Sequence, residues 1–137
     1  MTLHYLLDTD TCVGWLRGNE PVRRRLAMVG PTATAISIMT LAELRYGAAC
    51  SAHPEQNHQA IDSFLTGVTV VGLDLTAARA FGDIKAALRA QGMLLEDADL
   101  LVAATALAYQ LTLVTNNTQH FARISDLVIE NWLDTDQ

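Results

Sequence analysis

The sequence is poor in charged residues, and lysine is almost absent from it. Only 18% of the 137 residues are charged, against about 25% in an ordinary soluble domain, and Lys85 is the single lysine. The 15 Asp and Glu residues outnumber the 9 Lys and Arg residues, which leaves a formal net charge of −6. Because non-specific affinity for nucleic acids comes from basic residues, this balance taken alone argues against a nucleic-acid-binding protein.

Long apolar runs, secretory signals and metal-binding cysteine patterns are also missing. No uninterrupted apolar run approaches the ~20 residues that a bilayer-spanning helix needs. The first ten residues contain no lysine or arginine, unlike a secretory signal peptide. Cys12 and Cys50 lie far apart and outside any Cys-x-x-Cys pattern, which predicts buried free thiols and no zinc site. We therefore expect a cytoplasmic protein with no membrane segment.

Apolar and helical segments alternate along the chain. Half of the residues are hydrophobic, which excludes intrinsic disorder, and the length predicts one domain over residues 1–137. Strands are expected over residues 3–7, 34–37, 68–71, 111–115 and 127–129, and helices over 11–17, 21–29, 40–50, 54–67, 76–91 and 97–109. A polar turn is expected over residues 116–120. The alternation favours an α/β fold with a mainly parallel central sheet of about four to five strands.

Polar residues collect where the expected strands end. Asp8 follows the first strand, and Glu43 lies near the start of the helix after the second strand. Asp99 lies in the first turn of the apolar helix, and Thr115 and Asn117 come at the end of the fourth strand. Ligand sites in parallel sheets lie outside the carboxyl ends of the strands, so these side chains are expected to share one rim.

Three carboxylates on one rim predict a metal site. The acids Asp8, Glu43 and Asp99 would repel one another, at a cost that a bound cation removes. Oxygen ligands of this kind select Mg²⁺ or Mn²⁺. Such an ion activates water and stabilises charge on phosphoryl oxygens, so the rim is suited to phosphate chemistry.

Most of these residues also have an ordinary structural explanation. Asp8 is a good N-cap, Glu43 is a typical first-turn glutamate, and asparagines such as Asn117 are common in turns. Asp97 is better explained as the N-cap of its helix. Asp99 differs, because an acid in an otherwise apolar helix either faces a polar site or is buried at a cost.

The order and spacing of these motifs resemble the PIN-domain ribonuclease toxins of the VapC family, from VapBC toxin–antitoxin modules. The matching segments are LLDTD at 6–10, TLAELRYGA at 40–48, DLLVAATAL at 99–107 and LVTNNTQHFARISDLVIENW at 113–132. The first three segments carry Asp8, Glu43 and Asp99. The resemblance covers almost the whole chain.

The resemblance implies a fold and an activity. The fold would be a PIN-like three-layer α/β/α domain, and the activity would be that of a metal-dependent endoribonuclease toxin. Asp8 and Asp99, with Glu43 directly or through water, would hold Mg²⁺ or Mn²⁺. Thr115 would orient a carboxylate, and Asn117 would hold the scissile phosphate or a water molecule on the ion.

The resemblance also implies partners. The substrate would be a structured RNA such as tRNA or rRNA, and a VapB-like antitoxin would cover the active site with its C-terminal segment. A homodimer is expected as well. The apolar helix faces around Leu26, Leu44 and Phe64 are the candidate dimer and antitoxin surfaces, and the basic run Arg23–Arg25 is a candidate contact to RNA or to a partner.

Two positions depart from the family pattern. The family often carries a fourth acid in or just after the TNN turn, whereas the segment TNNTQHF here contains none, so that Asn117 or His120 would have to serve. The third residue of the opening motif is usually Asn or Ser, and here it is Asp10. The sequence therefore supports one metal ion, and the missing fourth acid weakens the case for a second.

Two alternatives remain open from the sequence. Asp8-Thr9-Asp10 after an apolar strand also resembles the nucleophile motif of haloacid-dehalogenase-type phosphatases, which needs a lysine near the phosphate, and Lys85 is the only one. The missing fourth acid would also suit a PIN-like scaffold that has lost activity and only binds a protein partner.

Overall fold

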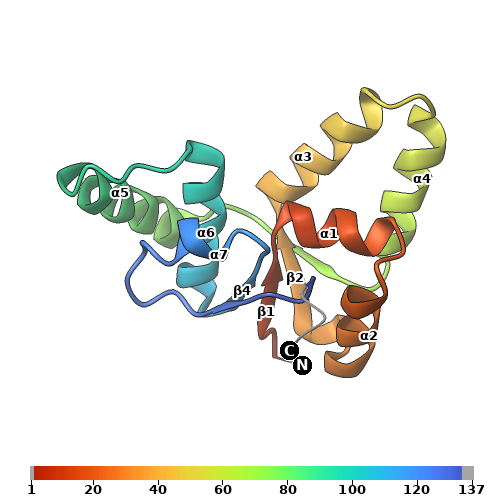
Figure 1. The fold of residues 1–137 in the computed structure, drawn as a ribbon, viewed down its shortest axis with the longest axis horizontal. Helices are drawn as coiled ribbons and strands as arrows, with labels where there is room; N and C mark the ends of the chain where they lie inside the picture. The colour runs from red at the N-terminus through yellow and green to blue at the C-terminus, as the bar shows by residue number, and fades with distance from the viewer. Residues whose placement is uncertain (1, 134–137) are drawn as a thin grey trace.

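The computed structural model describes residues 2–133. In chain order its elements are β1 (Tyr5–Leu7), α1 (Thr9–Leu16), α2 (Glu20–Val29), η1 (Pro31–Ala33), β2 (Thr34–Ser37), α3 (Ile38–Ala49), α4 (Pro54–Leu65), β3 (Thr69–Val71), α5 (Leu75–Ala90), α6 (Asp97–Tyr109), β4 (Thr112–Val114), α7 (Thr118–Phe121) and β5 (Ile129–Glu130). Helices and strands alternate as expected, with boundaries that differ from the expected ones by a few residues (Figure 1).

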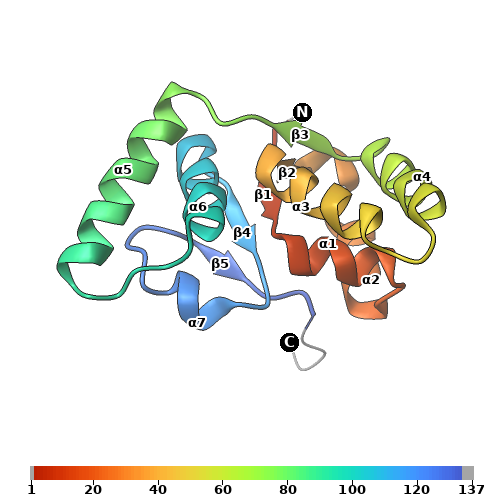
Figure 2. The ribbon, with the colours of Figure 1, turned by 90° about the horizontal axis from the view of Figure 1, so that it is seen from above.

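One parallel sheet organises the fold. Its five strands lie in the order β3-β2-β1-β4-β5, and every neighbouring pair is parallel. The helices lie on both sides of the sheet, with α5 and α6 on one side and α1 to α4 on the other (Figure 2). The prediction of a three-layer α/β/α domain with a parallel sheet is confirmed.

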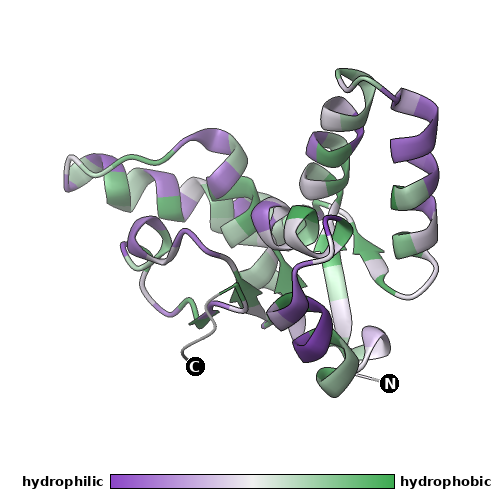
Figure 3. Ribbon diagram, turned by 45° about the vertical axis from the view of Figure 1, so that its right-hand side comes forward, coloured by the Kyte–Doolittle hydropathy of each residue, from purple (hydrophilic) through white to green (hydrophobic). Residues whose placement is uncertain are grey.

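The central strands are buried on both faces, because successive side chains point to opposite sides. Leu6 and Leu113 pack into a core beneath α5, α6 and α7. Their neighbours Leu7 and Val114 pack into a second core beneath α1 to α4. Figure 3 shows hydrophobic strands between the helix layers, with a hydrophilic stretch on α2 and both hydrophilic and hydrophobic turns along α4.

Several sequence expectations are wrong. Leu26, Leu44 and Phe64 are buried in the second core, so they are not spare apolar surface for a partner. Cys12 is buried as expected, but Cys50 is exposed. The expected polar turn over residues 116–120 contains the short helix α7. The expected strand over residues 68–71 does form, as β3, but it lies at the edge of the sheet with two of its three residues exposed.

Helix α6 begins without a side-chain cap and ends at a residue with a left-handed backbone. Glu96, not Asp97, is its N-cap, and no side chain caps it; Asp97 instead accepts a hydrogen bond from the Lys85 Nζ atom at 2.9 Å. The expected capping role of Asp97 is therefore wrong. At the other end, Gln110 adopts a left-handed conformation with φ 57° and ψ 47°, and the chain turns directly into β4. No helix within residues 2–133 has the length and apolarity needed to cross a membrane.

Replacement of Gln110 by glycine is expected to stabilise the protein. A left-handed backbone costs a residue with a Cβ about 1 kcal/mol, and glycine escapes this cost. Gln110→Gly should therefore raise the free energy of unfolding in urea by up to about 1 kcal/mol. Gln91 ends α5 with φ −91°, so Gln91→Gly is the matched control and should give no gain. Equal effects of the two variants would contradict this account.

Candidate active site

The site begins where β1 and β4 end side by side. Leu7 pairs with Val114 in the sheet, so the next residues, Asp8 and Thr115, are neighbours. The Asp8 backbone N–H donates to the Val114 carbonyl at 2.8 Å, and the Thr115 hydroxyl donates to Asp8 Oδ2 at 2.9 Å. Both residues are buried, with Asp8 only 7% exposed.

Asp8 also begins α1. Its Oδ1 atom accepts a hydrogen bond from the Thr9 backbone N–H at 2.8 Å, and Asp8 is the N-cap of the helix. The capping role and the site position, which the sequence presented as alternatives, therefore belong to the same side chain. Two hydrogen bonds and burial hold its carboxylate in one orientation.

Thr9 connects Asp8 to Glu43. The Thr9 hydroxyl donates to Glu43 Oε1 at 2.7 Å, across 34 residues of sequence. Glu43 lies in the second turn of α3, because the helix starts at Ile38, two residues earlier than expected. Its side chain is exposed. The glutamate thus reaches the site from a helix that follows β2.

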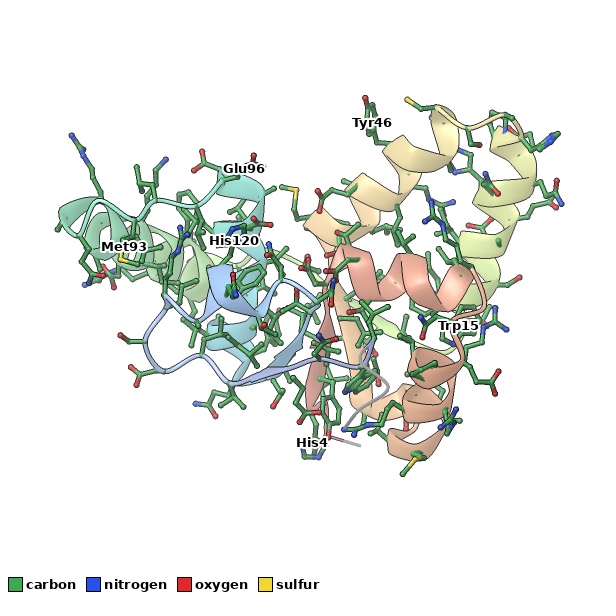
Figure 4. All side chains as sticks on the ribbon, viewed as in Figure 1. His4, Trp15, Tyr46, Met93, Glu96 and His120 are labelled. Carbon is green, nitrogen blue, oxygen red and sulfur yellow. The ribbon has the colours of Figure 1, made fainter. Side chains whose placement is uncertain are left out.

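Asp99 reaches the site from α6. It lies in the first turn of that helix and is half-buried. Glu96 and His120 both act electrostatically on it, and Figure 4 shows these two side chains at the start of α6 and on α7. His120, a weaker candidate from sequence, therefore lies near a site acid.

The turn after β4 brings Asn117 and, unexpectedly, Asp10 into the site. Asn117 is the N-cap residue of α7, and its backbone N–H donates to the Thr115 hydroxyl at 3.0 Å. Asp10 Oδ2 accepts from the Asn116 backbone N–H at 3.1 Å. From the sequence, Asp10 was a departure from the PIN-domain pattern and part of the phosphatase-like motif, and it was not expected to join the ribonuclease site.

One open pocket of about 780 Å³ joins these groups. Its lining includes four acids and one base among the described residues: Asp8, Asp10, Glu43, Asp99 and Arg17. It also includes Asn117. The structure therefore brings together four of the five residues expected on one rim, and the fifth, Thr115, lies directly behind Asp8.

Ionisation of the acids that line the pocket is less favourable in the folded protein than in water. Burial and, next, the charge of Asp10 raise the pKa of Asp8 to about 6, against the two hydrogen bonds, which lower it. Burial also raises the pKa of Asp10. The pKa of Asp99 rises through burial and the charges of Glu96 and Glu43, while His120 opposes the rise. Burial is the largest cause for all three acids, and neighbouring negative charge adds to it for Asp8 and Asp99.

The donor set fits a hard cation, although the side chains are not gathered around one point. The pocket offers carboxylate oxygens, which suit Mg²⁺ or Mn²⁺. Within residues 2–133, no three acidic, histidine or cysteine side chains are close enough together to hold one ion. Asp8 is rigidly bonded, whereas Glu43 is exposed and Asp99 half-buried. Binding of one ion by all three therefore requires Glu43 and Asp99 to turn inward.

The remaining basic residues contribute little to the pocket. Arg23 stacks on the Trp15 ring at 4.4 Å from its centroid, and Arg25 forms an ion pair with Glu130 at 2.9 Å. Lys85 is paired with Asp97 and does not line the pocket around Asp8. A phosphatase of the haloacid-dehalogenase type needs a lysine there, so that alternative is wrong.

The fold and the pocket define the class of protein: a three-layer α/β/α domain with acids gathered at the carboxyl end of a parallel sheet. A family model described as the PIN domain matches residues 5–127. The chain belongs to the PIN-domain family and, within it, to the VapC ribonuclease toxins of toxin–antitoxin modules.

Relatives and solved structures agree over nearly the full length. The chain is 35% identical to Ribonuclease VapC2 of Rickettsia felis, over 93% of this chain and 97% of the relative. It is 35% identical to the tRNA(fMet)-specific endonuclease VapC of Shigella flexneri, over 95% of this chain and 98% of that one. The DNA-bound VapBC structure from Salmonella typhimurium matches with a TM-score of 0.90 at 35% identity, covering 95% of this chain and 98% of that chain.

Removal of the buried charge is expected to stabilise the fold. Because the pKa of Asp8 is about 6 in the folded state and 3.8 for an ordinary aspartate, the folded protein binds more protons between these values, and stability falls as pH rises through them. In EDTA at pH 7.5, Asp8→Asn should raise the free energy of unfolding by about 2–3 kcal/mol.

The dependence of stability on pH distinguishes the loss of the buried Asp8 charge from a general effect of substitution. Below about pH 4 the Asp8 carboxyl is protonated, so Asp8→Asn and wild type should then have equal stability. Asp83→Asn, which removes an exposed charge paired with Arg79, should change stability by less than about 0.5 kcal/mol at either pH. If the Asp8→Asn variant is less stable than wild type at pH 7.5, burial of the ionised Asp8 carboxylate does not destabilise the fold.

Proposed function

We propose that this chain is a cytoplasmic Mg²⁺- or Mn²⁺-dependent endoribonuclease toxin that a cognate antitoxin neutralises. The observation that supports this most is the pocket at the carboxyl end of the sheet, which four acids and one arginine line. Burial raises the pKa of Asp8, Asp10 and Asp99, and repulsion from neighbouring acids adds to the rise for Asp8 and Asp99, so a bound cation would stabilise the ionised carboxylates. Such a pocket is suited to phosphodiester hydrolysis.

Each residue has a role that follows from its place. Asp8 and Asp99 would hold the ion, with Glu43 joining them directly or through water. When bound, such an ion activates water and neutralises charge on the phosphodiester. Thr115 fixes the orientation of Asp8 through its hydroxyl, and Asn117, at the pocket wall, would hydrogen-bond the scissile phosphate.

The proposed substrate is a structured RNA. The Shigella flexneri relative is named for cleavage of tRNA(fMet), and proteins read RNA sequence mainly in unpaired loops. We therefore propose that this chain cleaves an unpaired loop of tRNA or rRNA. Its acidic surface makes general RNA affinity weak, so the pocket itself supplies most of the attraction for phosphate.

The proposed partner is a VapB-like antitoxin. The similar solved structures include toxin–antitoxin complexes from Rickettsia felis and Salmonella typhimurium, both described as bound to DNA. A basic side chain of an antitoxin would neutralise the same acids that we assign to the ion. A homodimer is proposed as well; exposed Val70, Leu73 and Leu75, at and after the edge strand β3, offer apolar surface for it.

Loss of the Asp99 charge should abolish cleavage. Asp99→Asn keeps the size of the side chain but removes an anionic ion ligand, so RNA cleavage in Mg²⁺ should fall by about 100-fold or more. The measurement is the single-turnover rate on total tRNA and rRNA, with the cut sites mapped by sequencing RNA ends. The matched control is Asp97→Asn, two residues away and paired with Lys85 outside the pocket.

The two variants also decide whether the chain is an inactive scaffold. The control should cleave within about twofold of wild type. An Asp99→Asn rate within a few-fold of wild type would overturn the assignment of Asp99. Absence of both RNA cleavage and Mn²⁺ binding in the wild type would favour the scaffold alternative instead.

Arg17 should help to bind the RNA. It is the one basic residue lining the pocket within the described part of the chain, at the opposite end of α1 from Asp8. Arg17→Gln should raise KM, leave kcat unchanged and reduce the salt dependence of binding by about one phosphate contact. Arg89→Gln, an exposed arginine at the end of α5 and outside the pocket, is the control and should leave KM unchanged. Equal KM values for both variants would exclude Arg17 as a phosphate contact.

A further inference from the structure

The turn that follows β4 carries two groups of the site. Thr115 orients Asp8 through its hydroxyl, and Asn117 lines the pocket. Between them lies Asn116, which is exposed and makes no contribution to the pocket lining. A turn exposed to solvent is mobile unless it is bonded to rigid elements, so the position of Asn117 depends on what holds Asn116.

Asn116 is held from two sides. Its backbone N–H donates to Asp10 Oδ2 at 3.1 Å, which ties the turn to the first turn of α1. Its side-chain Oδ1 atom accepts from Asn131 Nδ2 at 3.1 Å, which ties the turn to the segment after β5. Asp10 and Asn131 thus clamp the same residue by two independent hydrogen bonds.

Asp10 acts in this clamp as a hydrogen-bond acceptor. Its Oδ1 atom accepts a second hydrogen bond from the Thr11 hydroxyl at 3.3 Å, which steadies the carboxylate on α1. Hydrogen bonds to a carboxylate are stronger than those between neutral groups.

We propose that Asp10 is a positioning residue, whose carboxylate holds the turn Thr115–Asn117 against α1 so that Asn117 stays at the pocket. It does so by accepting the Asn116 N–H, not by binding the ion as a fourth carboxylate. This inference rests on the proposed ribonuclease function, but the clamp itself is tested without RNA.

Two substitutions at one position separate acceptor from ion ligand. Asp10→Asn keeps an oxygen that can accept the Asn116 N–H but loses the charge, whereas Asp10→Ala loses both. Three quantities are measured on the full chain: kcat for RNA cleavage in Mg²⁺, the dissociation constant for Mn²⁺ alone, and the hydrogen-exchange rate of the Asn116 amide. Asp10→Asn should keep most of the kcat and the slow Asn116 exchange of wild type, and it should weaken Mn²⁺ binding only by the few-fold that loss of one nearby charge costs.

Asp10→Ala should release the turn. We expect kcat to fall by about 10-fold or more and the Asn116 amide to exchange about 10-fold faster, with the same Mn²⁺ affinity as Asp10→Asn, because both variants lose the same charge. Asn131→Ala removes the other half of the clamp and no acid, and should lower kcat in the same direction. Asp83→Ala, on α5 and outside the pocket, is the control for loss of an acid.

Other outcomes overturn the proposal. If Asp10→Asn weakens Mn²⁺ binding by about 100-fold and lowers kcat as strongly as Asp10→Ala does, Asp10 is an ion ligand. If Asp10→Ala leaves the exchange of Asn116 and kcat at wild-type values, the clamp has no function. If the wild type does not cleave RNA, the proposed function fails, whereas the exchange and Mn²⁺ measurements still decide the role of Asp10.

Discussion

The buried carboxylate of Asp8 is the group on which the rest of the site depends. One of its oxygens caps α1, the other accepts the Thr115 hydroxyl, and its backbone N–H extends the pairing of β1 with β4. The helix, the two central strands and the turn to α7 therefore meet at one charged side chain. Burial raises the pKa of Asp8 to about 6, so the fold carries this charge at neutral pH against its own stability.

This cost indicates function because it has no structural benefit that a neutral side chain would not give. An asparagine or serine could cap α1 as well as an aspartate does. What a neutral residue cannot do is attract a cation. Around Asp8 the fold adds Asp10, Glu43 and Asp99 on the same pocket, with Arg17 as the one base among the described lining residues. The net charge of −6, which taken alone argued against nucleic acid, thus includes acids concentrated where a bound ion would attract phosphate.

The regular alternation of strands and helices made the fold predictable from the sequence. Helix Asp97–Tyr109 and strand Thr34–Ser37 have the bounds expected from the sequence, because apolar runs end there at polar residues. The errors arose where tertiary contacts decide. Leu44 was expected on a partner-binding surface but is buried in the second core, because a sequence does not show how many helices cover one face of a sheet. Asp97 seemed a cap, but Lys85 of α5 binds it across the helix pair.

The sequence by itself determined the alternation of elements, the PIN-domain motifs and the acids Asp8, Glu43 and Asp99 at expected strand ends. The alternation follows from local periodicity, and the shared position of the acids follows from the rule that parallel strands end at one rim, whereas the motifs were identified by their resemblance to a known family. Only the tertiary structure decided how the acids are held. Thr9 binds Glu43 across 34 residues and Asp10 binds Asn116 across 106. Contacts over such separations depend on strand order and register, which no local pattern encodes.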